Sequence, residues 1–110
     1  MEGRAWSKTE KRIARAAFDR ALQREFAAVR EILLRKVEAS REMADIWDIH
    51  RYLRERLREV EEKYDYRYSV MILKLAILLK EGWIGEEDLA GLSDDKVEAV
   101  RSMFKPLLRP

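Results

Sequence analysis

The first half of the chain contains a long stretch, residues 7–39, that has neither proline nor glycine. Ser7 and Glu10 have the spacing of a capping box at its start, and Glu31 and Arg35, four positions apart, are a helix-stabilising pair. Large apolar side chains recur at gaps of four, four, three, four and four positions: Phe18, Leu22, Phe26, Val29, Leu33 and Val37. This is the period of one helical face. The sequence therefore predicts one uninterrupted helix, about 48 Å long at 1.5 Å per residue.

A second helix is predicted from about residue 45 to residue 64. Its apolar positions again recur every three or four residues: Ile46, Ile49, Leu53, Leu57, Val60 and Tyr64. Glu59 and Lys63 are expected to form an ion pair four positions apart. Ser40 and Asp45 are both candidate N-caps for this helix. The sequence leaves open whether the two helices join through a kink or through a short irregular turn.

Shorter elements follow. A third helix is predicted over 68–80 because the segment is apolar on nearly all sides, and Gly82 is expected to end it in a left-handed conformation. A short helix is predicted at 86–90. A last helix is predicted over 93–104, and Pro106 is expected to stop it.

These elements predict an all-α fold in a single domain, residues 1–110. Two long helices within 7–64 form a stalk, and two to three shorter helices within 65–110 form a head. The first helix exceeds the diameter of about 34 Å of a compact domain of this size, and an apolar stripe on a protruding stalk requires a partner. We expect a symmetric homodimer, although the first helix could instead fold back on the second as a hairpin. The expected dimer-interface residues are Phe26, Val29, Leu33, Val37, Ile46 and Leu53.

The composition argues against several classes of function. The chain has no cysteine, and its 23 basic and 21 acidic residues nearly cancel to a net charge of +2. A dedicated nucleic-acid binder would show a clustered basic excess, so that function is kept only as a weaker alternative. No nucleophile–base pair, metal cluster or phosphate-binding loop is recognisable. We therefore expect no catalytic residue, no metal, no cofactor and no small-molecule substrate.

The chain also has no evident membrane or export signal. The longest apolar run, 70–79, is interrupted by Lys74 and is shorter than the about 20 residues that span a bilayer. The N-terminal residues lack the apolar centre of a signal peptide. A cytoplasmic protein without membrane insertion is expected.

The second helix carries a candidate binding surface beside its apolar face. At about 100° per residue, Trp47, Arg51, Arg54 and Arg58 lie along one side, and His50 lies between them and the apolar residues. Trp and Arg are the residues most enriched at binding hot spots. These residues predict a protein-binding strip for an acidic partner with an apolar pocket. The alternative is an ordinary solvated face, because nearby glutamates dilute the positive charge.

Four segments together resemble the fluorescence recovery protein family of phycobilisome-bearing photosynthetic bacteria. They are AWSKTE, IWDIHRYL, KYDYRYSV and LLKEGWI, and the match runs from Trp6 to about Leu92. The resemblance implies a dimeric, all-helical regulator without enzymatic activity or cofactor. It implies binding to the C-terminal domain of the photoactivated orange carotenoid protein, faster return from its red to its orange state, and an end to phycobilisome quenching.

The resemblance also implies roles for individual residues. Trp47 and His50 match residues of the family's functional patch, and Ile46 matches a position that packs across the dimer. A family aromatic residue on the third helix is matched by Leu73, which we add to the partner-binding set. The chain departs from the family at Arg51, where an acidic residue is typical, and at Leu57, where an arginine is typical. A homologous homodimeric scaffold or adaptor that acts on another protein therefore remains the alternative function.

Overall fold

The computed structural model describes residues 5–108. The elements are α1 (Lys8–Ala39), α2 (Met43–Lys63), the 3₁₀ turn η1 (Tyr68–Val70), α3 (Met71–Glu81), the 3₁₀ turn η2 (Glu86–Leu89) and α4 (Asp94–Leu108). Within the described residues there is no strand. The predicted all-α fold class is confirmed.

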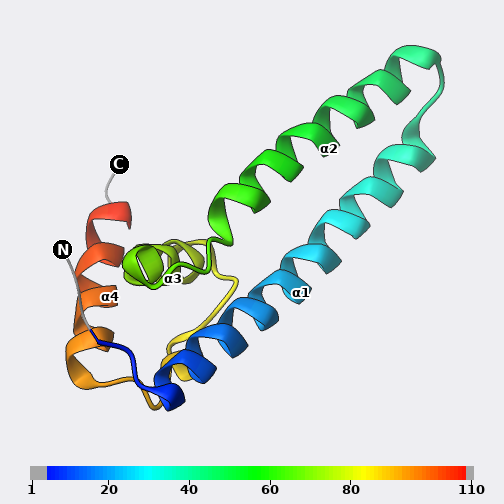
Figure 1. The fold of residues 1–110 in the computed structure, drawn as a ribbon. Helices are drawn as coiled ribbons and strands as arrows, with labels where there is room; N and C mark the ends of the chain where they lie inside the picture. The colour runs from blue at the N-terminus through cyan, green and yellow to red at the C-terminus, as the bar shows by residue number, and fades with distance from the viewer. Residues whose placement is uncertain (1–4, 109–110) are drawn as a thin grey trace.

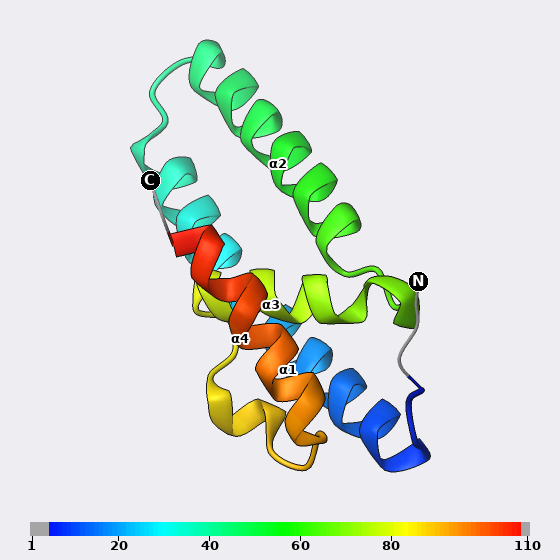
Figure 2. The same cartoon turned by 90° about the vertical axis from the view of Figure 1, so that its left-hand side faces the viewer.

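The molecule is elongated, with principal extents of 53 × 30 × 23 Å and a radius of gyration of 16.7 Å. The helices α1 and α2 run antiparallel as a hairpin, which is the stalk, and α3 crosses the root of that hairpin (Figure 1). The last helix, α4, packs against α3, and with η1 and η2 the two helices form the head (Figure 2). The single chain thus adopts the hairpin that the sequence left as an alternative. The hairpin nevertheless leaves an apolar face exposed, as described below.

The joint between α1 and α2 is a short irregular turn. The Ser40 hydroxyl donates to the carbonyl of Val37 at 2.6 Å and so closes α1 instead of capping α2. Asp45 lies in the first turn of α2, where its carboxylate accepts the backbone N–H groups of Arg41 and Glu42 at 2.7 and 3.1 Å. Neither predicted N-cap holds that position, because Glu42 is the N-cap and Asp45 reaches back from inside the helix.

The core lies where the N-terminal half of α1 packs into the head. Its α1 side is formed by Phe18 and three alanines, all fully buried, and its head side by apolar residues of α3, η2 and α4. The fully or nearly fully buried head residues include Met71, Leu75, Ala76, Leu78, Leu89 and Val100. The alanines at 14, 17 and 21 let the helices approach closely, so the base of α1 is held firmly.

The ends of α1 and α3 agree with the sequence. The Ser7–Glu10 capping box is present in both directions at 3.1 Å. Gly82 ends α3 with φ +85°, a left-handed backbone conformation that residues with a Cβ rarely adopt. The segment from Tyr68 begins with the turn η1 before α3 proper, and the short helix predicted at 86–90 is the turn η2.

The predicted end of the last helix is wrong. Helix α4 continues past Pro106 to Leu108. A proline lacks the N–H donor and its ring crowds the carbonyl four residues earlier, but only two helical residues follow it here. No helix in the described part of the chain is long and apolar enough to cross a membrane.

Candidate protein-binding site

The predicted strip lies on the exposed side of α2. The Trp47 side chain is 59% exposed, although tryptophan normally buries most of its surface. His50, one turn further along, is also exposed. The N-terminal cap at Glu42 and Asp45 fixes where α2 begins and therefore which way Trp47 points. Exposure of these side chains is required for a partner to bind them. Binding by this strip stays a prediction.

The cationic part of the strip is exposed as well. Arg51, Arg54 and Arg58 all face solvent. The Arg51 guanidinium forms an ion pair with Asp48 at 2.8 Å, but both side chains are more than half exposed. Such a surface pair contributes at most about 1 kcal/mol. Arg51 can therefore exchange Asp48 for an acidic group of a partner at little cost.

Leu73, the remaining partner-binding candidate, lies elsewhere. It is half-buried on α3, in the head. Trp47 precedes Lys63 at the end of α2 by sixteen positions, which places it about 24 Å along the stalk at 1.5 Å per residue. Helix α3 lies at the root of the stalk (Figure 1), so within one chain the fold does not bring Leu73 next to a residue about 24 Å along α2. A partner that touches both must bridge the stalk and the head, or the two must come from different chains.

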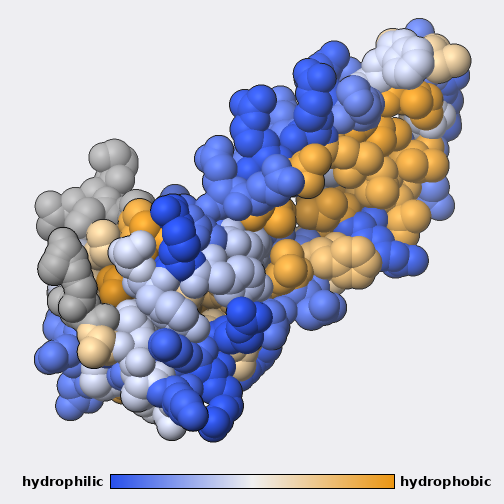
Figure 3. Space-filling model, in the orientation of Figure 1, coloured by the Kyte–Doolittle hydropathy of each residue, from blue (hydrophilic) through white to orange (hydrophobic). Residues whose placement is uncertain are grey.

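The expected dimer-interface residues form an apolar face on the stalk. Apart from Met103, every large apolar side chain that is exposed within residues 5–103 lies on α1 or α2. Phe26 is 60% exposed, and Val37, Ile46 and Leu53 are exposed too, while Val29 and Leu33 are half-buried. Figure 3 shows an apolar band along the outer part of the stalk, across both helices.

The apolar stripe predicted on α1 is therefore divided between two surroundings. Phe18, at its start, is fully buried in the core, whereas Phe26 and the residues beyond it are not covered within the chain. Beside Phe18, the core takes the alanine face of α1, which the predicted stripe of large apolar residues does not include. Helix α2 adds only Ile49 as a buried apolar residue. The hairpin alone leaves the outer stalk with little core.

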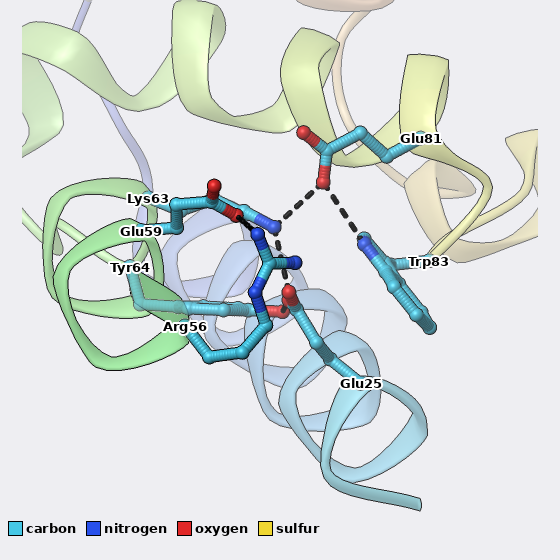
Figure 4. A network of polar contacts seen from close by, with 7 residues as sticks. All are labelled: Glu25, Arg56, Glu59, Lys63, Tyr64, Glu81 and Trp83. Carbon is cyan, nitrogen blue, oxygen red and sulfur yellow. Dashed lines mark hydrogen bonds and ion pairs between the residues drawn. The ribbon is translucent and has the colours of Figure 1, made fainter. Parts of the chain in front are cut away.

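A polar network lies at the root of the stalk (Figure 4). The Lys63 ammonium donates to Glu25 Oε2 at 2.8 Å and to Glu81 Oε1 at 2.6 Å. The Tyr64 hydroxyl donates to Glu25 Oε1 at 2.9 Å, and the Trp83 indole N–H donates to Glu81 Oε1 at 2.9 Å. The network joins α1, the end of α2 and the end of α3. We name these five residues the root network.

The protonation states of the root network follow from its contacts. Burial alone would lower the pKa of Lys63, but the hydrogen bonds to Glu25 and Glu81 outweigh burial and raise it. Burial and the hydrogen bond to Glu25 raise the pKa of Tyr64 above its ordinary value. Lys63 therefore stays charged and Tyr64 stays a donor throughout the ordinary pH range.

The root network was not predicted, and one predicted pair is wrong. Lys63 turns inward to Glu25 and Glu81, and Glu59 pairs with Arg56 instead. The helical period does indicate that Lys63 and Glu25 lie on buried faces of their helices. Lys63 follows Ile49 by fourteen positions, which returns it to within about 40° of the buried face. Glu25 likewise follows the buried Phe18 by seven.

Chemistry of other kinds is not visible in this part of the molecule. No group of three or more His, Cys, Asp or Glu side chains that could hold a metal ion occurs within residues 5–108. The exposed features with a recognisable binding chemistry are the apolar stalk face and the strip beside it. Their arrangement is suited to contact with other proteins.

The fold and these surfaces define an elongated all-helical protein with a hairpin stalk, a helical head and surfaces suited to protein binding. The family model for "Photoprotection regulator fluorescence recovery protein" matches residues 6–104. The chain belongs to this family, as the resemblance indicated.

Individual relatives agree with that assignment. The fluorescence recovery protein of Synechocystis sp. PCC 6803 is 34% identical over 100 residues, covering 91% of this chain and 92% of the relative. The structure of the Fremyella diplosiphon fluorescence recovery protein superposes with a TM-score of 0.87 at 36% identity, covering 92% of this chain and 99% of the other. The Synechocystis structure gives 0.88 at 33% identity with the same coverage.

Proposed function

We propose that this chain is a non-enzymatic regulator that binds the C-terminal domain of the photoactivated orange carotenoid protein. It speeds the return of that protein from the red to the orange state and so ends phycobilisome quenching. The observation that carries the proposal is the exposure of Trp47, an indole left open to solvent beside His50 and the arginines of α2. Membership of the fluorescence recovery family supports a role in photoprotection, and the resemblance implies the carotenoid protein as the partner.

The mechanism follows from binding alone. A protein that binds one conformational state of a partner more tightly than another shifts the partner toward the preferred state. The exposed indole needs an apolar pocket, and Arg54 and Arg58 need acidic groups beside it. The carotenoid-protein state that presents such a pocket is the one that this chain stabilises. No bond is made or broken, so neither a catalytic residue nor a cofactor is required.

We further propose that the working form is a homodimer. The apolar face around Phe26, Val37, Ile46 and Leu53 is exposed on a stalk with little core of its own. An exposed apolar surface of this kind is typical of an interface. A two-fold axis would pair the same face of two chains, so that each residue set meets its own copy. Burying this face would also stiffen the outer stalk and with it the strip.

The alternative function keeps the dimer and changes the partner. Arg51 places a positive charge next to His50, where the family typically has a negative one. The Asp48–Arg51 pair neutralises part of this charge in the free chain. A scaffold or adaptor that recognises another acidic protein would have the same exposed surfaces.

The deciding experiment measures dark recovery. The orange carotenoid protein is photoactivated and mixed with the purified chain, and the return of its orange absorbance is followed in the dark. Acceleration, together with a complex on size-exclusion chromatography, is the expected result. An unchanged recovery rate with no complex removes the carotenoid protein as the partner and leaves the adaptor function. Trp47→Ala, with Met43→Ala as a control of similar exposure one helical turn away on the same side of α2, tests whether the Trp47 indole carries the effect.

A further inference from the structure

The root network is almost entirely buried at its centre. The Lys63 side chain is 8% exposed and that of Glu25 is 3% exposed, while Glu81 lies nearer the surface. Burying charges costs free energy unless they are paired and hydrogen-bonded. Here one ammonium is shared by two carboxylates, and Tyr64 and Trp83 donate to the oxygens (Figure 4). The charges are therefore well satisfied.

Replacing a buried ion pair by apolar residues of similar size is often neutral or stabilising, and in several proteins the buried polar group instead specifies one arrangement of its partners. Lys63 is the last residue of α2, Glu25 lies in the middle of α1, and Glu81 ends α3. The contacts among their side chains link the ends of α2 and α3 to α1.

Helix α2 packs along α1 and is joined to it by the turn at residues 40–42 (Figure 1), but it buries only Ile49 and Lys63. The chain after Lys63 leaves the helix at once, and Tyr64 is both its C-cap and a member of the root network. At the end of α2 that meets the head, the direction of the helix is therefore set by residues 63 and 64.

A small change at that end is amplified along the stalk. Trp47 lies sixteen residues before Lys63, about 24 Å along the helix axis, so a tilt of about 10° at the root displaces Trp47 by about 4 Å. A displacement of that size would carry the indole out of a partner's pocket.

We propose that Lys63 is a positioning residue that holds α2 at a fixed angle to the head through Glu25 and Glu81, so that the strip around Trp47 and the Leu73 region of the head meet a partner in one relative placement. This inference rests on the proposed function for its purpose, but the angle itself can be measured on the free protein.

The test uses the absence of cysteine in the chain. Spin labels are placed on two introduced cysteines, Glu55→Cys on the exposed side of α2 and Glu98→Cys on the exposed side of α4. Electron–electron distances are measured with an excess of unlabelled chain, so that only pairs within one chain are counted. Lys63→Gln removes the shared ammonium, and Glu81→Gln removes one carboxylate while leaving the Glu25–Lys63 pair. Glu62→Gln, a change at an exposed neighbouring position, is the matched control, and Lys63→Arg restores a cation.

The expected result is a distance distribution that broadens or shifts by several ångströms in Lys63→Gln, less in Glu81→Gln and not in Glu62→Gln, at unchanged helicity. Lys63→Arg is expected to recover most of the original distribution. If Lys63→Gln does not fold, the comparison of Glu81→Gln with Glu62→Gln decides. Distributions identical to the unmodified chain in every folded variant overturn the inference. The carotenoid protein plays no part in this measurement, so failure of the proposed function and failure of this inference are distinguishable.

Discussion

The carboxylate of Glu10 lies 3.2 Å from the ammonium of Lys96, which joins the first turn of α1 to the first turns of α4. Glu10 also accepts the backbone N–H groups of Ser7 and Ser93 at 3.1 and 2.9 Å. The hydrogen bonds from Ser7 and Ser93, with Lys96, lower the pKa of Glu10 from 4.5 to about 2. One carboxylate therefore holds the N-terminal cap of α1 and the start of α4 together.

This contact predicts a loss of stability in acid. A carboxyl group whose pKa is lower in the folded than in the unfolded state stabilises the fold above the unfolded pKa, and the effect disappears as the pH falls through the folded pKa. The contribution of Glu10, up to about 3 kcal/mol, should disappear between pH 4.5 and about 2. Urea unfolding at a series of pH values measures it.

Glu10→Gln is the variant that isolates this contribution, because the pKa values of Asp88 and Glu86 are also lowered and add to the acid dependence. The variant should be less stable at pH 7 and should show a shallower loss between pH 4.5 and 2. An unchanged pH profile in Glu10→Gln would assign the acid sensitivity to other carboxylates.

The helices themselves could be predicted because their signals are local. The period of apolar residues, the Ser7–Glu10 box and Gly82 each act within a few positions, and the structure contains all of them. The contacts that organise the helices are not local. Glu10 meets Lys96 across 86 positions, and Glu25 meets Lys63 across 38. In a chain with 40% charged residues, spacing alone cannot identify which pairs these are.

The candidate site could be predicted only in part, for a related reason. The helical period predicts Trp47 beside the apolar face of α2, because this position depends only on the residues of α2 itself. Among the fully buried residues of α1, only Phe18 could be predicted from large apolar side chains, because alanines fill the rest of that face. Small side chains there let the head elements come close to α1.

A charge placed within the apolar stalk face should convert the proposed dimer to a monomer. Ile46→Glu would bury a carboxylate in an apolar interface at a cost of several kcal/mol, enough to dissociate a dimer at micromolar concentration. Size-exclusion chromatography with light scattering measures the molar mass. Ala44→Glu, exposed and about 160° around α2 from Ile46, is the control and should leave the molar mass unchanged. A dimeric Ile46→Glu would remove this face from the interface.

Tyr64→Phe tests the root network by removing one donor. Its hydroxyl donates to the buried Glu25 carboxylate, and loss of a hydrogen bond to a charged group costs about 1.5–3 kcal/mol. Tyr68→Phe is the comparison, because Tyr68 packs its ring on Trp6 and makes no hydroxyl hydrogen bond within residues 5–103; we expect a change below about 0.5 kcal/mol. Urea unfolding at one fixed protein concentration measures both, since the proposed dimer would make stability depend on concentration. Equal losses in the two variants would contradict the role given to Tyr64.

Trp47→Ala tests the strip where it is expected to matter most. Truncating a tryptophan hot spot typically costs 2 kcal/mol or more, which is about a 30-fold weaker dissociation constant. The helix should not suffer, because alanine favours helix more than tryptophan does and the indole is 59% exposed. Calorimetric titration against the photoactivated carotenoid protein measures the affinity, with circular dichroism and molar mass as checks on the fold and the dimer. Met43→Ala removes a side chain that is 62% exposed and lies one helical turn before Trp47, and it should weaken binding several-fold less. The two truncations remove comparable exposed apolar groups. Equal losses of affinity would therefore mean that the partner recognises the apolar character of this part of α2 and not the indole itself. No loss of affinity in Trp47→Ala would place the docking surface elsewhere on the molecule.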